Sequence, residues 1–173
     1  MVQRPRGSVR EKILSFMPSE EIKSHPDVAA ILAANPEYLI DGKIDRGETT
    51  LVVAAEHIVA VGQILKSKQE YVRLSTVTGV DWYPAEPRFE VVYHLHSLSR
   101  NVRLRVKCRL PGANAEIDSL TGVWRSANWY ERETFDLFGV RFRNHPDLTR
   151  IVMPLDWEGH PLRKDYPVTG TRV

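Results

Sequence analysis

The sequence contains a single cysteine, Cys108, and no apolar run long enough to cross a bilayer. A disulfide within the chain is therefore impossible, and one thiol cannot hold an iron–sulfur cluster, which usually takes four cysteines. The most apolar stretch, Leu51–Leu65, is shorter than the roughly 20 residues that a membrane helix needs. No apolar run follows the arginines near the N-terminus, so we expect no signal peptide. We expect a reducing compartment, and membrane association only through other chains.

Two further absences concern nucleotides and nucleic acids. No Gly-x-Gly-x-x-Gly or phosphate-binding loop occurs in the sequence, so nothing in it indicates bound NAD, flavin or ATP. The net charge of +2 is too small to favour nucleic acid or an anionic membrane as a partner. The 173 residues, 42% hydrophobic and 27% charged, are ordinary for one globular domain with a sizeable core.

The middle of the chain alternates apolar and polar residues in the manner of β-strands. The clearest case is Asn101–Leu110, in which every second residue from Val102 is apolar and the residues between are basic. Arg88–Leu98 also alternates, and the tight turn near Ser97–Arg100 predicts a hairpin. Weaker strand patterns cover four further stretches: Tyr38–Ile44, Thr49–Ala54, Tyr71–Val77 and Ala115–Trp124.

Helical patterns are predicted at Glu11–Phe16, after His25-Pro26, and at Ala55–Lys68. Together with the strands they indicate an α+β fold: a mostly antiparallel sheet with helices on one side, followed by an extended irregular C-terminal tail. We expect an N-terminal helical segment over residues 1–35, the α+β domain over residues 36–140, and an extended partner-binding tail over residues 141–173.

A further short helix is predicted to start at Asn128 and to end at Gly139. Asn128 is a good N-cap, Glu131 would complete a capping box with it, and Gly139 can adopt the left-handed conformation that ends a helix. One face of this helix is apolar, and the other carries mainly charged residues. The apolar residues are Tyr130, Thr134, Phe135, Leu137 and Phe138, and those on the other face are Trp129, Arg132, Glu133 and Asp136.

Two acidic residues break the local rules of this helix. Glu131 falls on the apolar face, and Asp136 lies near the negative end of the helix dipole, where a carboxylate is unfavourable. Glu131 could serve the capping box and Asp136 could pair with Arg132 one turn back. Alternatively, both carboxylates meet charges on another chain.

Residues 141–173 show no sustained helical or alternating period, and prolines interrupt them repeatedly. A structureless segment of this length is usually functional or disordered. Disorder fits poorly, because Trp157, Leu162 and Tyr166 stand among the charged residues of the segment. We interpret the tail as a surface laid against a partner.

Other patterns suggest sites less strongly. His94 and His96 share one strand face and could bind zinc, but no further ligand is nearby in the sequence, so a solvated face is the alternative. The basic residues Arg103, Arg105, Lys107 and Arg109 could follow phosphates, or form a solvated face or a protein contact. Cys108 lies on the apolar side of its strand, as a buried hydrophobe would. Glu131, Glu133 and Asp136 do not form a convincing general acid–base pair.

Three runs in the C-terminal part carry a resemblance to a known family. They are Glu131-Arg-Glu-Thr-Phe-Asp-Leu-Phe-Gly139, His145-Pro-Asp-Leu-Thr-Arg-Ile151 and Pro154-Leu-Asp-Trp-Glu-Gly-His-Pro-Leu-Arg-Lys-Asp-Tyr166. The chain resembles the 30 kDa (C) subunit of NADH-quinone oxidoreductase, respiratory complex I. The match is contiguous over about 40 residues, and weaker similarity extends over most of the chain beyond about residue 35.

The resemblance implies a structural subunit of the peripheral arm, with no catalytic residue and no cofactor of its own. In that family, flavin and iron–sulfur clusters lie on other subunits, and the whole complex couples electron transfer from NADH to quinone to proton translocation. The implied partners are above all the larger (D) subunit, which forms the wall of the quinone site, and a small cluster-bearing subunit, at the cytoplasmic face of the inner membrane. The implied interface residues are Glu131, Arg132, Glu133, Asp136, Arg150, Asp156, Trp157, Arg163, Lys164, Asp165 and Tyr166.

Two alternatives remain at this point. One is the homologous subunit of a membrane-bound nickel–iron hydrogenase, whose complexes share this subunit type. The other, from a different class, is a free-standing module that binds nucleic acid through the basic strand Asn101–Leu110.

Overall fold

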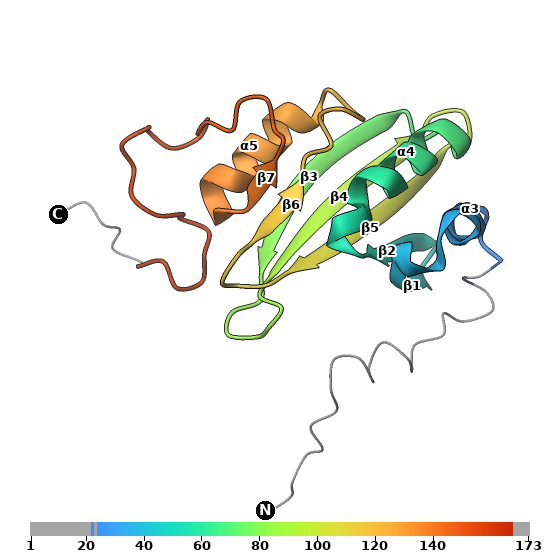
Figure 1. Ribbon diagram of the computed structural model, residues 1–173, viewed down its shortest axis with the longest axis horizontal. Coiled ribbons are helices and arrows are strands. Elements are labelled where there is room, and N and C mark those ends of the chain that lie inside the picture. Colours follow the sequence, from blue (N-terminus) through green and yellow to red (C-terminus); the bar gives the residue numbers. More distant parts are fainter. Residues whose placement is uncertain (1–21, 23, 168–173) are drawn as a thin grey trace, which may run out of the picture.

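A five-stranded sheet forms the centre of the protein. The computed structural model describes residue 22 and residues 24–167. The sheet has the strand order β1-β2-β5-β4-β3. Its strands are β1 (Leu39–Asp45), β2 (Glu48–Val53), β3 (Arg73–Asp81), β4 (Phe89–Ser97) and β5 (Val102–Leu110). The β1–β2, β3–β4 and β4–β5 pairs are antiparallel, while β2 and β5 pair in parallel. The predicted mostly antiparallel sheet is confirmed (Figure 1).

The hairpin formed by β4 and β5 follows the alternation of the sequence. Its register runs without interruption from Phe89 opposite Leu110 to Ser97 opposite Val102. The apolar residues of both strands face the same way, and Val91 and Cys108 are fully buried. Cys108 is thus a core side chain, as predicted, and burial raises the pKa of its thiol.

The two long helices cover one face of this sheet. Helix α4 (Ile58–Lys68) follows the short η2 turn (Ala55–His57) and packs with Val61 and Leu65 toward β4 and β5. Helix α5 (Ala127–Phe138) packs on β3, where the Thr134 hydroxyl donates to the Val77 carbonyl over 3.3 Å. Val77 is the register partner of Tyr93, which faces α4, so both helices lie on one side. The prediction of helices on one side is confirmed.

The first helix of the described chain, α3 (Pro26–Ala34), is held to the sheet by a buried polar group. Asp27 accepts hydrogen bonds from the Tyr71 hydroxyl over 2.6 Å and from Arg100 over 2.9 Å. A short η1 turn (Pro36–Tyr38) then leads into β1. The predicted helix at Glu11–Phe16 lies outside the described residues.

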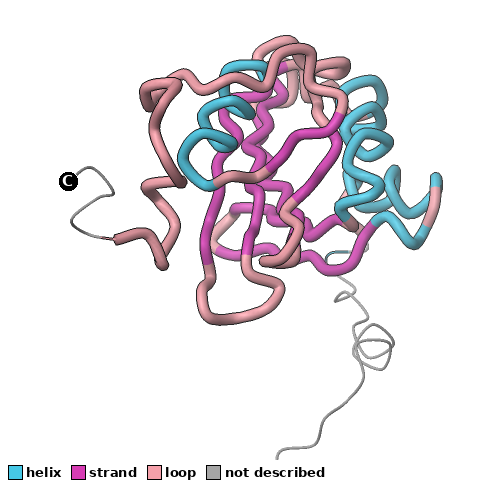
Figure 2. Tube along the Cα trace, turned by 60° about the vertical axis from the view of Figure 1, so that its left-hand side comes forward, coloured by secondary structure: helices cyan, strands magenta, loops and turns pink. Residues whose placement is uncertain are grey.

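A small second sheet joins the segment before α5 to the segment after it. Strand β6 (Glu116–Asp118) pairs in parallel with β7 (Arg141–Arg143). The sequence pattern did not predict β7, because three residues are too few to show a period. After β7, residues 144–167 form one long loop outside α5 (Figure 2). Within the described part of the chain, none of the helices has the length and apolar character to span a membrane.

Candidate partner-binding surface

Helix α5 begins one residue earlier than predicted and ends where predicted. Ser126, not Asn128, is the N-cap, and its side chain makes no capping hydrogen bond. At the other end, Gly139 is left-handed with φ 73° and ψ 23°, and its N–H donates to the Phe135 carbonyl over 2.8 Å. The predicted helix end is therefore confirmed, whereas the predicted capping box is wrong.

Glu131 connects α5 to the segment that follows β6. Its carboxylate accepts a hydrogen bond from the Ser119 hydroxyl over 2.6 Å and one from the Leu120 N–H over 2.7 Å. The Nε2 of His145 lies 3.9 Å from the same carboxylate, and both side chains are fully buried. Burial raises the pKa of Glu131 to about 7, against the two hydrogen bonds that lower it. Glu131 thus has a structural role in the domain itself.

This raised pKa gives a pH-dependent contribution to stability. Between pH 4.5, the ordinary pKa of the side chain, and about 7, the folded state holds a proton that the unfolded state has lost. The free energy of unfolding therefore falls as pH rises through this window, by up to about 1.4 kcal/mol per pH unit. We expect Glu131→Gln to remove this fall, because glutamine keeps both hydrogen-bonding positions without a charge.

The measurement is denaturant unfolding of the wild type and of Glu131→Gln at several pH values from 4.5 to 8. Burial lowers the pKa of His145 and so works in the opposite direction, which is why only the difference between the two proteins isolates Glu131. Glu133→Gln, on the exposed side of the same helix, is the control. Parallel profiles for wild type and Glu131→Gln would contradict the prediction.

Asp136 anchors the first part of the tail. Its Oδ1 accepts from Arg150 over 2.6 Å. Its Oδ2 accepts from the backbone N–H groups of Ile151, Val152 and Met153 over 3.0, 2.8 and 2.9 Å. Burial alone raises the pKa of Asp136, but these donors outweigh it and hold the pKa below its usual range. They also offset the unfavourable helix dipole.

Arg132 does not pair with Asp136, so the predicted pairing within the helix is wrong. Its guanidinium donates instead to the carbonyl of Thr149 over 3.0 Å and to the Thr149 hydroxyl over 2.7 Å. It also lies over the Trp129 ring, 5.1 Å from the ring centroid. Arg132 and Asp136 thus hold neighbouring residues of the tail along one side of α5.

The tail also caps the C-terminal end of α5. The last carbonyls of a helix have no partner within the helix and need other donors. Here the Asp136 carbonyl lies 2.9 Å from the His160 ring, the Leu137 carbonyl accepts from the Leu162 N–H over 3.0 Å, and the Phe138 carbonyl accepts from Arg163 over 2.6 Å. The chain therefore returns to α5 after its excursion through residues 151–159.

A second anchor holds the end of the described tail. Arg88 donates through Nε and Nη2 to the buried Asp81, over 2.8 Å in each case. The same guanidinium donates to Asp165 over 2.9 and 2.6 Å. The Lys164 N–H completes the group by donating to Asp81 over 2.8 Å. The hydrogen bonds from Arg88 lower the pKa of Asp81 to about 2, despite burial.

Between its anchors the tail presents apolar side chains to solvent. Leu155 is 82% exposed, Val152 54% and Leu162 49%. Trp129 on α5 is 63% exposed and lies beside Arg132, which itself holds the tail. We call these four residues, Trp129, Val152, Leu155 and Leu162, the tail surface. Trp and Arg are the residue types most enriched at energetically important interface positions, so this combination suits a protein partner.

The structure separates the residues implied as an interface into two groups. Glu131, Asp136, Arg150 and Arg163 make contacts within this chain that fix the tail. The exposed residues of the set lie on the outside of α5 or of the tail: Glu133, Asp156, Lys164 and Asp165. Arg132, Trp157 and Tyr166 are half-buried. Their role toward a partner stays a prediction.

Sequence reasoning missed Arg88 and Asp81, which hold the end of the tail although they lie far earlier in the chain. The signal that could have found them is weak, because Asp81 was noted only as part of a turn. It also missed Leu155, the most exposed apolar residue of the tail. His94 and His96 lie on the same sheet face, and no group of three or more metal-ligating side chains occurs among the described residues.

Comparison with known proteins decides the family. A family model described as "Respiratory-chain NADH dehydrogenase, 30 Kd subunit" matches residues 51–172, which is more than half of the chain. This chain belongs to that family. Members that carry the name of the C subunit of NADH-quinone oxidoreductase are similar to it. The protein from Geobacter sulfurreducens is 50% identical over 133 residues, covering 76% of this chain and 82% of that protein.

A second relative of the same name, from Roseiflexus castenholzii, is 45% identical over 148 residues and covers 84% of this chain and 85% of its own length. Two solved structures share the fold of this family member. The trypsin-resistant fragment of Nqo5 has a TM-score of 0.62 at 28% identity and covers 70% of this chain and 99% of its own. A chain of an archaeal membrane-bound sulfane sulfur reductase has a TM-score of 0.66 at 29% identity, covering 82% and 84%.

Proposed function

We propose that this chain is a non-catalytic structural subunit of the peripheral arm of NADH-quinone oxidoreductase. The relatives that carry that enzyme's name are about 50% identical to it. The observation that supports a structural role is the tail, which is anchored at both ends to its own domain and exposes apolar side chains between the anchors. Such a surface is prepared for a partner, because the ordering of the segment has already been achieved.

The partner of the tail surface is, in this proposal, the larger (D) subunit of the peripheral arm, with a small cluster-bearing subunit nearby. Flavin and iron–sulfur clusters are held by other subunits, and the chain binds none. It reaches the inner membrane, on the cytoplasmic side, only as part of the complex. Its contribution to NADH–quinone electron transfer and proton translocation is to hold the electron-transferring subunits together.

The similarity to a membrane-bound sulfane sulfur reductase supports a related alternative, in which the chain serves another respiratory membrane complex. That similarity is 29% in identity, whereas the NADH-quinone oxidoreductase relatives reach 45–52%. We therefore favour NADH-quinone oxidoreductase. Membership of this family gives no support to a free-standing nucleic-acid-binding module.

Leu155→Asp tests the proposed role of the tail surface. The side chain is 82% exposed in this chain, so its replacement leaves the fold intact, while a buried interface position would lose about 1.5–3 kcal/mol of apolar burial and gain a charge. We expect at least a fivefold lower content of this chain in complex purified from native membranes. NADH–quinone turnover per assembled complex should stay unchanged.

Leu98→Asp is the matched control, since Leu98 is 59% exposed and lies in the turn between β4 and β5, away from the tail. Equal depletion by both variants would show that the effect is not specific to the tail surface. Normal assembly with lost turnover would show instead that Leu155 takes part in catalysis, and the structural role would be wrong.

A further inference from the structure

The sheet face opposite α4 and α5 carries a row of basic side chains. On β5 these residues alternate with buried ones such as Leu104 and Val106, so they point away from the helices. The row consists of Arg103, Arg105, Lys107 and Arg109. The register partners of Arg103 and Arg105 on β4 are His96 and His94.

The cations of this row exceed the carboxylates that neutralise them. Glu90, only 1% exposed, binds both Lys107, over 2.7 Å, and Arg109, over 3.4 Å. Glu48 binds Arg105 over 2.7 Å. Arg103 is exposed and forms no ion pair within the part of the chain that the structure describes. The row therefore has an excess of positive charge, located at the Arg103 end.

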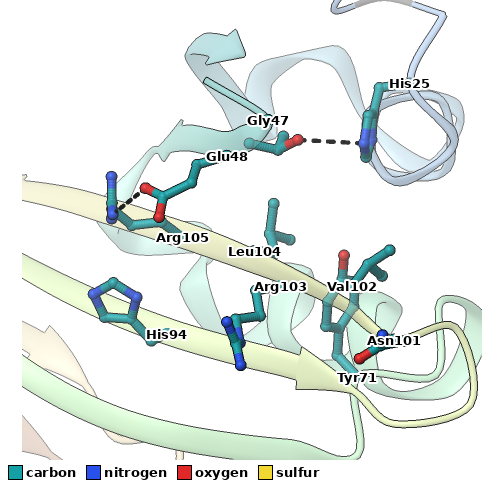
Figure 3. Close-up of a pocket in the computed structure, with 11 residues that line it drawn as sticks. His25, Gly47, Glu48, Tyr71, His94, Asn101, Val102, Arg103, Leu104 and Arg105 are labelled. Atoms are coloured by element: carbon teal, nitrogen blue, oxygen red, sulfur yellow. Dashed lines mark hydrogen bonds and ion pairs between the residues drawn. The ribbon is translucent and has the colours of Figure 1, made fainter. Parts of the chain in front are cut away.

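A cavity of about 510 Å³ opens at this end of the row. It lies between the start of β5, the β1–β2 turn and His25 before α3 (Figure 3). In Figure 3 the Glu48–Arg105 ion pair stands at one end of the cavity and His25 at the other. The pairing of β2 with β5 begins at Thr49 opposite Leu104, so Val102 and Arg103 precede the paired residues on that side.

A second cavity of about 320 Å³ adjoins the first across the Glu48–Arg105 ion pair, which lines both. It adds Lys43 and Arg46 to the lining, with Asp45 as a further carboxylate. We call the two cavities together the basic groove. Its lining carries more arginine and lysine than aspartate and glutamate, and it also includes His25 and His94.

We propose that the basic groove is a second interaction surface, and that it takes an acidic segment of another polypeptide. The charge excess calls for an anionic occupant. The groove is long and open, so an extended chain fits it better than a single small anion. The unpaired start of β5 offers backbone hydrogen-bonding groups to such a chain.

A nucleic acid fits the groove less well than an acidic peptide. Glu48 lies in its middle, where it would repel a continuous line of phosphates. A peptide can place its carboxylates beside Arg103 and Arg46 and a neutral residue beside Glu48. This inference concerns a surface away from the tail and does not rest on the tail surface.

The test is fluorescence anisotropy with the full-length chain and a labelled 12-residue peptide of alternating glutamate and glycine. A peptide with glutamine in place of glutamate and a 12-nucleotide single-stranded RNA are the comparison probes. We expect saturable binding of the glutamate peptide that weakens at least fivefold between 50 and 300 mM salt. Arg103→Glu should weaken it at least tenfold, and Arg103→Gln about threefold.

Arg141→Glu is the matched control, because Arg141 is 72% exposed and lies on β7 outside the groove. It should change the affinity less than twofold, as should Leu155→Asp on the tail surface. The proposal is overturned by an absence of binding, by equal affinity for the glutamine peptide, by equal loss in Arg103→Glu and Arg141→Glu, or by tighter binding of the RNA. Thermal melts of both arginine variants verify that each is folded.

Discussion

Asp136→Ala is expected to release residues 150–153 from α5. The substitution leaves the N–H groups of Ile151, Val152 and Met153 without their acceptor and removes the partner of Arg150, whose side chain is only 15% exposed. Removing one partner of a buried ion pair typically costs about 3–5 kcal/mol. We expect a loss near the lower end of this range, since the freed tail can take its donors to water.

The release is measured by hydrogen exchange at the amides of 151–153 and by the rate of trypsin cleavage after Arg150. Both should rise at least tenfold in Asp136→Ala. Glu133→Ala, an exposed acidic residue on the same helix, removes a carboxylate that is not part of the anchor and should change neither rate. If Asp136→Ala left both rates at wild-type values, Asp136 would not be the anchor of this segment.

Arg88→Ala is expected to free the other end of the tail and to destabilise the domain. Arg88 connects the fully buried carboxylate of Asp81 to Asp165, two residues that lie far apart in the sequence. The pair with Asp165 contributes little by itself, because Asp165 is 45% exposed. The larger effect comes from Asp81, whose buried charge would lose its counter-ion, at a cost of about 3 kcal/mol.

The pH dependence provides a specific signature of this anchor. The pKa of Asp81 is lowered by Arg88 to about 2, so its contribution to stability is present above the ordinary pKa of 3.8 and is lost as pH falls toward 2. That contribution is about 2 kcal/mol. Wild type should therefore lose this stability on acidification, while Arg88→Ala should lose much less.

Unfolding of wild type, Arg88→Ala and Arg88→Lys between pH 2 and 6 makes the measurement. Lysine keeps the charge but lacks the planar fork that lets arginine bind two carboxylates at once, so it should recover only part of the stability. Arg141→Ala, an exposed arginine outside the anchor, is the control. An acid transition in Arg88→Ala that matches wild type would show that Asp81 does not depend on Arg88.

Local patterns in the sequence predicted the elements that depend on neighbouring residues. The alternation in Asn101–Leu110 predicted β5 and the face that Cys108 buries, and Gly139 predicted the end of α5. These features depend on the strand period of two residues and on the left-handed conformation that glycine tolerates. Both are properties of a few adjacent residues, which is why a single sequence shows them.

Features that join distant residues were not predicted. The parallel pairing of β2 with β5 depends on how the intervening helix and hairpin pack, and no local pattern records it. The same holds for Arg88 with Asp165, and for Glu131, which finds Ser119 and Leu120 instead of its own helix start. Polar side chains select partners by tertiary position, and several partners were chemically equivalent in the sequence.

The tail combines both kinds of feature. We expected a second polypeptide to cover it, because its residues cannot form a core of their own. The structure shows that its backbone is bound to its own domain by Asp136 and Asp81, while Leu155 and its apolar neighbours stay exposed. The need for a partner is thus confined to side chains on the outside of an already ordered segment.

A photo-reactive cross-linking residue at position 155 gives the most direct measurement of the proposed role. The variant chain is assembled into the complex in cells, irradiated in native membranes, and analysed by mass spectrometry. The proposal predicts a cross-link from position 155 to a larger subunit of the same complex, and none from the same residue placed at position 98. Cross-links from position 155 only within this chain, or none at all, would show that the tail surface is not an interface, and would contradict the proposed role.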